Sequence, residues 1–592
     1  MSNLVNRLRG SRLESIGTLI VVAAALRYWL LYFHRSTNLL DEGSQAAQAL
    51  RILQGDLIYR DFFTVVTPGS YYTVAWLFQL FGTELIVMRW AALAMGLGIL
   101  LATLIVARHL MCWPFAAAAA LMTTVWGWFL VTPNLYSWEA ALFSLIALAC
   151  YLRGVGSAHA PWIVFAGVAT GLAALMKQNV GVYTATALLL TIWLSRVVDS
   201  GGDVRGRVRR TARFVAGMCL PIVPTLWLLI LAGAGPYLYE SWVYYPLVLY
   251  PGRFSLPYPS FYPVLPEMDL STLLDVIPAM AQGSIPEPAV YEVWTKLVLY
   301  LPVLVYPFAL VSIGVLAFRF HRRGRVEAGH QAHALLAVSL TGLLTLLQAW
   351  PRADVTHILF GMQATFVVFG YLSFCAWRGL TTLPGPRLAL TGVALLVTLA
   401  PQILFLWNGY RRTEWEYSNY NVALRIDRAR GILASGIEAQ RIDLITRYIV
   451  AHTAPEEPVF VVPWAAGFYF LTNRSNPTRT DFMLFEDPES YPCVIARLDH
   501  NPPKYVIYGY VWDVDGKRFR DYARPLDEYI RSRYVIEDSV DGYEVWRRVE
   551  GTSRRNELWP GACQPKRFRL RDLWSRAIQA SPSSLGIANR FR

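Results

Sequence analysis

The chain alternates long apolar runs with short polar segments. A helix that crosses a bilayer needs roughly 17 to 25 consecutive apolar residues. Eleven runs approach or reach this length, near residues 15–33, 85–107, 114–131, 138–152, 161–176, 180–195, 214–233, 296–317, 333–350, 358–376 and 387–408. The pattern therefore predicts a polytopic α-helical membrane protein.

Arginines between the runs predict the orientation. Arg7, Arg9 and Arg12 precede the first run, and the even-numbered loops contain "RGRVRRTAR" and "FRFHRRGR". Such segments remain in the cytoplasm, and the first run is too long for a cleaved signal peptide. We expect an inner-membrane protein with a cytoplasmic N-terminus. Residues 34–84, 234–295 and everything after 408 then lie on the periplasmic side.

The outer segments have patterns of their own. "SQAAQALRILQG", from Ser44, places Ala47, Leu50 and Leu53 on one helical face, which predicts a helix lying along the membrane surface. The loop 234–295 is rich in Tyr and Pro. That composition suits an interfacial aromatic belt, and it equally suits a grip on a sugar ring or a prenyl chain.

The polarity changes after residue 408. A helix is expected over 437–453 with Leu444, Ile445, Tyr448 and Ile449 facing inward, and strands are expected at 458–462, 504–510, 534–538 and 543–548. We therefore divide the chain into a transmembrane module (1–408), an extracytoplasmic α/β domain (409–550) and a basic irregular tail (551–592).

Composition and charge narrow the function classes. With 592 residues, 55% hydrophobic and 16% charged, the chain is too apolar for a soluble protein. The net charge of +13 is scattered through the loops, which favours membrane topology over nucleic-acid binding. No His, Cys and carboxylate set has metal-ligand spacing. Outside the apolar runs, Cys493 and Cys563 are able to pair in an oxidising compartment.

Two adjacent acids, Asp41 and Glu42, stand where the chain leaves the first span. Asp41 has two interpretations. It can cap the helix that follows, because a short carboxylate accepts hydrogen bonds from free helical N–H groups. It can also take a proton from an incoming hydroxyl, since acids at the membrane border that face a protein cavity usually have a function.

Several motifs in order resemble bacterial GT-C membrane glycosyltransferases, the relatives of protein O-mannosyltransferases and lipid A aminoarabinose transferases. They are "LLDEG", "AQALRILQGDLIYRDFF", "TPGSYY", "FGTELIVMR", "LAALMKQNVGVY", "LQAWPRADVTHILFG" and "FYFLTNRSNPT". The resemblance implies transfer of a sugar from a polyprenyl-phosphate donor to a glycan, lipid or protein acceptor at the outer face, with inversion. It implies that Asp41 is the general base and Glu42 its companion.

Basic residues at outer ends of spans are candidates for binding the donor phosphate, which leaves readily once its charge is neutralised. They are Lys177, Arg352 and His357. The alternatives are snorkelling to the interface and, for Arg352, a simple pair with Asp354. Candidates for binding sugar or acceptor are Arg60, Asn134, Glu139, Gln178 and Asp354, with Glu139 equally suited to a helix start.

The chain departs from the relatives in one motif. Where aminoarabinose transferases often carry Lys-Pro-Pro, this chain has "VTPGSYY". The phosphate-binding role of that lysine then falls to Lys177 or Arg352. We expect catalysis without a metal or other cofactor.

Three other functions fit parts of the pattern. An oligosaccharide or O-antigen ligase has the same fold and uses a preassembled glycan. A lipid-linked glycan transporter would place acids and helix breaks near the bilayer midplane, whereas the charges here gather at the outer surface. A non-catalytic binding protein would keep the topology alone. The leading hypothesis is a glycosyltransferase.

Overall fold

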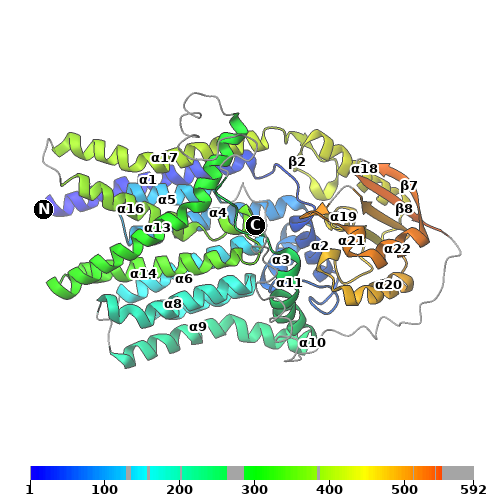
Figure 1. Cartoon of the computed structure of the whole chain (residues 1–592), viewed down its shortest axis with the longest axis horizontal. Coiled ribbons are helices and arrows are strands. Elements are labelled where there is room, and N and C mark those ends of the chain that lie inside the picture. The colour runs from blue at the N-terminus through cyan, green and yellow to red at the C-terminus, as the bar shows by residue number, and fades with distance from the viewer. Residues whose placement is uncertain are drawn as a thin grey trace, which may run out of the picture. The chain divides into compact units, whose positions relative to one another are not determined.

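The computed structural model describes residues 2–127, 135–156, 161–199, 203–262, 286–382, 387–510, 513–540 and 542–549. The chain forms two compact units, shown in Figure 1. Unit 1 comprises residues 1–35, 89–224 and 257–419, and unit 2 comprises 36–88, 225–256 and 420–592. Unit 2 therefore joins two outer loops to the C-terminal segment, a grouping that the linear division at residue 408 does not anticipate.

Long helices build unit 1, and each of the eleven expected spans coincides with one of them. They are α1 (Ser2–Tyr32), α4 (Leu85–Arg108), α5 (Trp113–Val125), α6 (Leu135–Gly156), α7 (Pro161–Met176), α8 (Gln178–Asp199), α9 (Val204–Leu231), α13 (Glu287–Arg323), α14 (Val326–Leu346), α16 (Gln363–Leu380) and α17 (Arg387–Tyr417). Short η3 (Leu347–Ala349) and α15 (Val355–Leu359) connect α14 to α16. Among the described residues, seven helices are long and apolar enough to cross a membrane.

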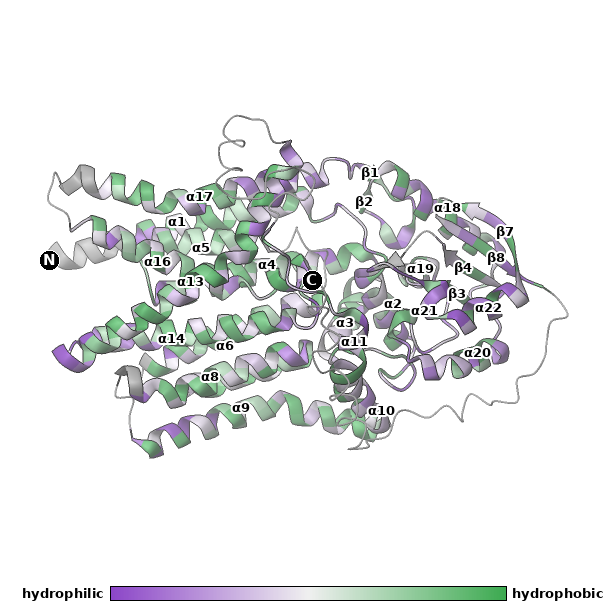
Figure 2. Cartoon of the chain, viewed as in Figure 1, coloured by the Kyte–Doolittle hydropathy of each residue, from purple (hydrophilic) through white to green (hydrophobic). Residues whose placement is uncertain are grey.

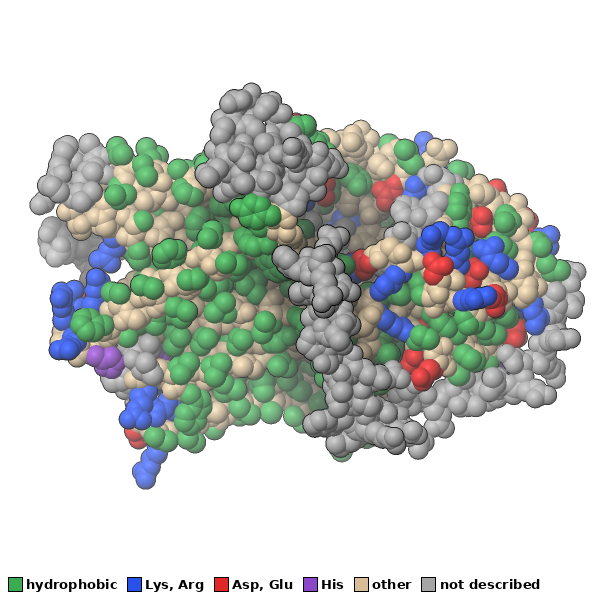
Figure 3. Space-filling model, viewed as in Figure 1, with side chains coloured by type: hydrophobic (Ala, Val, Ile, Leu, Met, Phe, Trp, Pro, Cys, Tyr) green, Lys and Arg blue, Asp and Glu red, His purple; other side chains and the backbone are tan. Residues whose placement is uncertain are grey.

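The helices of unit 1 expose apolar side chains on their outward faces. Figure 2 shows the hydrophobic character running along them, and Figure 3 shows apolar side chains over the helical surface. Trp227, Leu228, Phe308 and Leu396 are each about 60% or more exposed. Exposing such a surface to water costs free energy, whereas exposing it to lipid does not. The chain is a polytopic integral membrane protein.

Small residues allow α7 and α9 to pack closely. A Cβ on Gly167 would lie 2.1 Å from the carbonyl oxygen of Phe214, and one on Gly217 would lie 2.2 Å from that of Val164. Backbones approach this closely only at glycine, and such contacts hold helices together where the hydrophobic effect between them is weak.

Unit 2 has an α/β core preceded by short helices. Its helices include α2 (Asp41–Leu53), α3 (Gly69–Phe81), α10 (Gly235–Tyr239), the π-helix η2 (Glu240–Leu249), α11 (Tyr250–Phe254), α18 (Gly436–His452), α19 (Gly467–Thr472), α20 (Tyr491–His500), α21 (Phe519–Tyr522) and α22 (Arg524–Arg533). Single 3-10 turns are η4 (Asp427–Ala429), η5 (Met483–Phe485) and η6 (Pro488–Ser490).

The main sheet has the strand order β3-β4-β8-β7. Its strands are β3 (Val459–Val462), β4 (Tyr505–Gly509), β7 (Tyr534–Val540) and β8 (Tyr543–Arg548), each within two residues of the predicted position. β3 and β4 are parallel, and the other pairs are antiparallel. Two small ribbons pair β1 (Val422–Ala423) with β2 (Leu433–Ala434) and β5 (Asp513–Val514) with β6 (Lys517–Arg518). The helices α20 and α22 pack on the sheet around a core that includes Phe460, Val506 and Ile530.

One detail of the expected helices needs correction. On α18, Leu444 is 47% exposed, and the buried stripe is Ile442, Ile445 and Ile449. Those isoleucines have the three- and four-residue spacing that one helical face requires, and Leu444 lies outside it. Helix α2 packs on α3 and α19, and seven of its residues are buried. One face of α2 is therefore covered by protein.

Candidate functional site

Asp41 is the first residue of α2, and a neighbouring asparagine does the capping. The Asn38 side-chain oxygen accepts hydrogen bonds from the backbone N–H groups of Leu40 (3.0 Å) and Asp41 (2.8 Å). The Asn38 amide in turn donates to the Asp41 carboxylate at 3.3 Å. The helix start is therefore satisfied by Asn38, so the capping interpretation of Asp41 is wrong. Glu42, beside it, is buried.

A glycine contact fixes the start of α2 against α19. The backbone N–H of Gly467 donates to the carbonyl oxygen of Leu39 at 2.8 Å. A Cβ on Gly43 would lie only 2.5 Å from the Cα of Gly467. Because neither position has room for a side chain, the backbone two residues from Asp41 is held directly by backbone of the α/β core.

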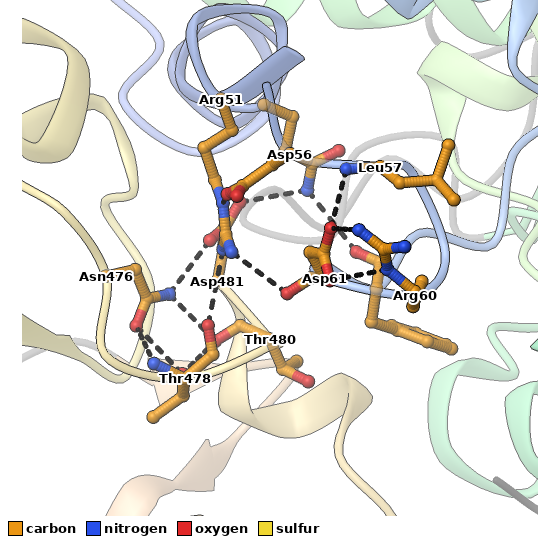
Figure 4. Close-up of polar contacts among 11 residues, drawn as sticks. Arg51, Asp56, Leu57, Arg60, Asp61, Asn476, Thr478, Thr480 and Asp481 are labelled. Carbon is orange, nitrogen blue, oxygen red and sulfur yellow. Dashed lines mark hydrogen bonds and ion pairs between the residues drawn. The ribbon is translucent and has the colours of Figure 1, made fainter. Parts of the chain in front are cut away.

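The polar face of α2 meets a buried acid from the C-terminal part of unit 2. Asp481 is 4% exposed and accepts hydrogen bonds from Gln48 (2.9 Å), Ser44 (3.4 Å) and Asn476 (2.9 Å). Figure 4 shows Asn476 and Asp481 joined beside Arg51 of α2. These bonds satisfy the buried carboxylate and attach α2 to a segment more than 430 positions away in sequence.

Tyr71, in the "TPGSYY" motif, lies within reach of both acids. Its hydroxyl bonds to Thr64 at 2.7 Å. Burial raises the pKa of Tyr71, and the negative charges of Asp481 and Asp41 raise it further. The charges of Asp41 and Asp481 thus both act on the buried Tyr71 hydroxyl.

Arg60 lies apart from this group. It is exposed, and its guanidinium forms two hydrogen bonds to Asp61, at 2.9 and 2.7 Å (Figure 4). Burial of Asp61 acts to raise its pKa, but Arg60 and the Leu57 N–H outweigh this and lower it. Arg51 of the same motif bonds to Asp56 and to the backbone of Asp61 and Thr478, so it joins the loop to the α/β core.

In unit 1, Lys177 is buried at the junction of α7 and α8. Only 9% of it is exposed. Its ammonium donates to the Ser137 hydroxyl at 3.0 Å and to the Gln348 side-chain oxygen at 3.4 Å, and it lies 5.2 Å from the centre of the Phe360 ring. Two neutral side-chain oxygens and an aromatic face therefore contact the Lys177 ammonium.

The other two basic candidates share one acid. Asp354 bonds to Arg352 at 2.7 Å and to the His357 ring at 2.8 Å, and its side chain also caps α15 at the His357 N–H. Burial acts to raise the pKa of Asp354, but the His357 and Arg352 interactions prevail and lower it to about 2. The predicted pair of Arg352 with Asp354 is confirmed. His357 lies 6.2 Å from Phe360, ring centre to ring centre, so Lys177 and His357 both lie near the Phe360 ring, and Arg352 shares Asp354 with His357.

Of the remaining candidates, the structure describes Glu139 and Gln178. Glu139 is buried in the first turns of α6, near Lys177's partner Ser137, and Gln178 begins α8. Asn134 lies outside the described residues. Within the part of the chain that the structure describes, no group of three or more His, Cys, Asp or Glu is arranged to hold a metal ion.

Sequence reasoning missed four residues that position the candidates. They are Asn38, Ser137, Gln348 and Asp481. Asn38 had a local signal, because Asn three residues before a helical acid is a capping pattern. Ser137, Gln348 and Asp481 had none, since their roles depend on contacts between segments far apart in the chain.

Known family models and curated proteins include no match to this sequence. Solved structures do match. ArnT from Cupriavidus metallidurans, solved with bound undecaprenyl phosphate, superposes with a TM-score of 0.51 at 16% identity over 90% of this chain and 98% of ArnT. The oligosaccharyltransferase AglB from Archaeoglobus fulgidus, in complex with an inhibitory peptide and dolichol-phosphate, gives a TM-score of 0.50 at 13% identity over 91% and 75%. The chain has the GT-C fold of these enzymes.

Proposed function

We propose that the protein transfers a sugar from a polyprenyl-phosphate donor to an acceptor hydroxyl at the outer face of the membrane. Asp41 takes the proton of the acceptor hydroxyl, the oxygen attacks the anomeric carbon, and the bond from that carbon to the donor phosphate breaks. The configuration inverts, and the polyprenyl phosphate leaves with its electron pair. Glu42 helps to position the acceptor.

The observation that carries this proposal is that Lys177 and His357 both lie near the Phe360 ring, while Arg352 and His357 share Asp354. A phosphate that gains charge as it leaves needs preorganised cations in a site of low polarity. Lys177 is nine-tenths buried there, and its ammonium donates to the Ser137 hydroxyl. The fold likeness to an enzyme solved with undecaprenyl phosphate supports the same class of donor.

The extent of the fold match favours a monosaccharide donor over a preassembled glycan. The chain covers 98% of ArnT, but only about three quarters of the oligosaccharyltransferase. We propose that the reaction proceeds without a metal, and a chelator that left activity unchanged would support this.

The location follows from chemistry on both units. Cys493 of α20 forms a disulfide, whereas Cys112, Cys150, Cys219 and Cys375 are free thiols. Cys563 lies outside the described residues. Disulfides persist in oxidising compartments, which supports a periplasmic position for unit 2 in the inner membrane of a bacterium. Exposed arginines gather where α13 ends and α14 begins (Figure 3), as expected for cytoplasmic loops.

The test separates donor binding from transfer. Purified protein in lipid nanodiscs would be assayed for binding of undecaprenyl phosphate and for transfer of labelled sugar from a polyprenyl-phosphate donor to membrane acceptors. Asp41→Asn should bind the lipid normally and transfer about 10² to 10⁴ times more slowly, the usual contribution of a general base. Lys177→Gln should lose lipid binding.

Matched variants control for charge. Asp427 is an exposed aspartate of the same unit as Asp41, and Lys296 is a second lysine in the helical unit. Asp427→Asn and Lys296→Gln should behave like the parent protein. Full transfer activity in Asp41→Asn would refute the assignment of the base, and unchanged lipid binding in Lys177→Gln would refute the phosphate site.

A further inference from the structure

The segment "RGRVRRTAR" forms the start of α9, and the function above does not use it. Helix α9 lies at the rim of the helical unit (Figure 1). Only 17% of its apolar window is buried, less than in any other candidate span among the described residues. The first turn of α9 contains no acidic residue. The arginines therefore lie at the end of a helix where the helix dipole disfavours positive charge.

Three of these arginines form one stripe along α9. Arg205, Arg209 and Arg213 are spaced by four residues, so their side chains lie one above another on the same helical face. Arg205 and Arg209 are exposed, and Arg213 is partly exposed. Like charges at this spacing repel each other. The arginine stripe by itself therefore destabilises the start of α9.

The opposite face of α9 packs on protein. Arg207 is 5% exposed, and its guanidinium carbon lies 5.8 Å from the centre of the Trp193 ring of α8. Phe214 is fully buried, and its carbonyl oxygen lies against Gly167 of α7. Both residues lie about 140 to 160° around the helix from Arg209. The arginine stripe therefore points away from α7 and α8.

The face that carries the arginine stripe continues as an apolar surface. Leu220 follows Arg213 by about two helical turns, and Val223 follows Arg209 by about four. Leu220 is 62% exposed and Val223 is 55% exposed. The apolar part of α9 after Arg213 is about 27 Å long, close to the thickness of about 30 Å of the hydrocarbon layer. The stripe therefore begins where the hydrocarbon ends, and it faces lipid headgroups.

The described part of the chain supplies no acidic partner to the arginine stripe. Asp203, directly before α9, accepts a hydrogen bond from the Gly206 N–H at 2.8 Å. None of the three stripe arginines forms an ion pair with a described acid. By contrast, Arg108 at the end of α4 pairs with Glu14 at 3.0 Å. The positive charge of the stripe is therefore not explained by contacts within the described chain.

We propose that the arginine stripe binds the phosphate groups of anionic phospholipids in the leaflet that it faces. Guanidinium groups form paired hydrogen bonds to phosphate oxygens. Basic residues beside a membrane-spanning helix attract anionic headgroups. The bound phosphates also reduce the repulsion between Arg205, Arg209 and Arg213. This lipid site is separate from the residues that we propose for sugar transfer.

The experiment compares two phospholipids that differ in headgroup charge. Full-length protein in mild detergent would be titrated with dioleoyl phosphatidylglycerol or dioleoyl phosphatidylcholine, and bound lipid would be counted by native mass spectrometry. Phosphatidylglycerol should bind more tightly, and added salt should reduce the difference. Each arginine beside anionic lipid contributes a factor of about five to affinity. The triple variant Arg205→Gln, Arg209→Gln and Arg213→Gln should therefore lose at least one tightly bound phosphatidylglycerol, with affinity about 100-fold lower at that site.

Two controls separate the stripe from charge in general. Arg207→Gln changes an arginine on the opposite face of the same helix. Glutamine at Arg430, Arg518 and Arg524, which are exposed arginines of unit 2, removes the same charge as the triple variant. Both controls should bind phosphatidylglycerol like the parent protein. Lysine at the three stripe positions keeps the charge and should restore most of the binding, so a loss of fold and a loss of charge give different results.

Four results would overturn the proposal. They are equal affinity for the two lipids, parental phosphatidylglycerol binding in the glutamine variant of the stripe, an equal loss in either control, and no recovery with lysine. Water-soluble glycerophosphoglycerol should compete poorly. Binding of that compound as tight as binding of the lipid would also contradict the proposal, because the stripe would then recognise a free phosphate and not a membrane.

Discussion

Replacing Gly43 by alanine tests whether contact between α2 and α19 holds Asp41 in place. The new Cβ would lie 2.5 Å from the Cα and 2.7 Å from the nitrogen of Gly467. Carbon atoms in contact prefer about 3.5 to 4.0 Å, so the two backbones must separate by roughly 1 Å. Both contacts are with backbone, and therefore no side-chain rotation relieves them.

Two effects of different size follow. Overpacking of this kind costs about 1 to 3 kcal/mol of unfolding free energy. A displacement of about 1 Å at a reacting group can reduce the rate about 10²-fold. We therefore expect Gly43→Ala to remain folded, with a modestly lower thermal midpoint, and to lose sugar transfer through kcat more than through KM.

The assay compares transfer of labelled sugar with thermal unfolding on the same purified samples. Gly436→Ala is the control, because its Cβ would meet only Val422, at 4.0 Å. If Gly43→Ala transferred sugar at the parental rate, the α2–α19 contact would not determine the position of Asp41. If it unfolded outright, Gly467→Ala, whose Cβ would meet the Leu39 side chain at 2.7 Å and the Leu39 Cα at 3.0 Å, would test whether activity falls in step with stability.

Three further predictions address other parts of the molecule. Because the pKa of Asp354 is lowered to about 2, its charge interactions stabilise the fold above about pH 4 and are lost as the pH falls towards 2. In Asp354→Asn the free energy of unfolding should therefore depend less on pH between about 4 and 2. An unchanged pH dependence would refute the interaction of Asp354 with Arg352 and His357. Gly217→Leu should prevent α7 and α9 from packing and give aggregated protein in size-exclusion chromatography, whereas Gly314→Leu, on an open surface, should not. Arg474 donates to Thr453 and Thr472 at the C-terminal ends of α18 and α19, so Arg474→Met should lower unfolding free energy by about 2 to 3 kcal/mol. Exposed Arg425→Met is its control, and equal stability of the two variants would contradict that role.

The sequence by itself determined the elements of this protein. Helices in a membrane must satisfy their backbone hydrogen bonds internally, so a run of apolar residues is sufficient to predict a span. All eleven runs coincide with helices. The strands could also be predicted from short stretches of sequence, because Val, Ile and Tyr between turn residues favour strands. "PVFVV" and "YEVWRR" each lie on a strand. Motif order also pointed to the GT-C fold.

The tertiary structure decided what the polar residues do. Asp41 had two local interpretations, and only the structure shows that the Asn38 side-chain oxygen accepts the hydrogen bonds of the Leu40 and Asp41 N–H groups. Lys177 was recognisable as a basic residue at a span end, but its fixation by Ser137 and Gln348 joins three separate segments. Asp481 had no signal at all, since a hydrogen bond between residues hundreds of positions apart leaves no periodicity in the chain. Local patterns encode the backbone, because its interactions are near in sequence, whereas a site is made of side chains that only folding brings together.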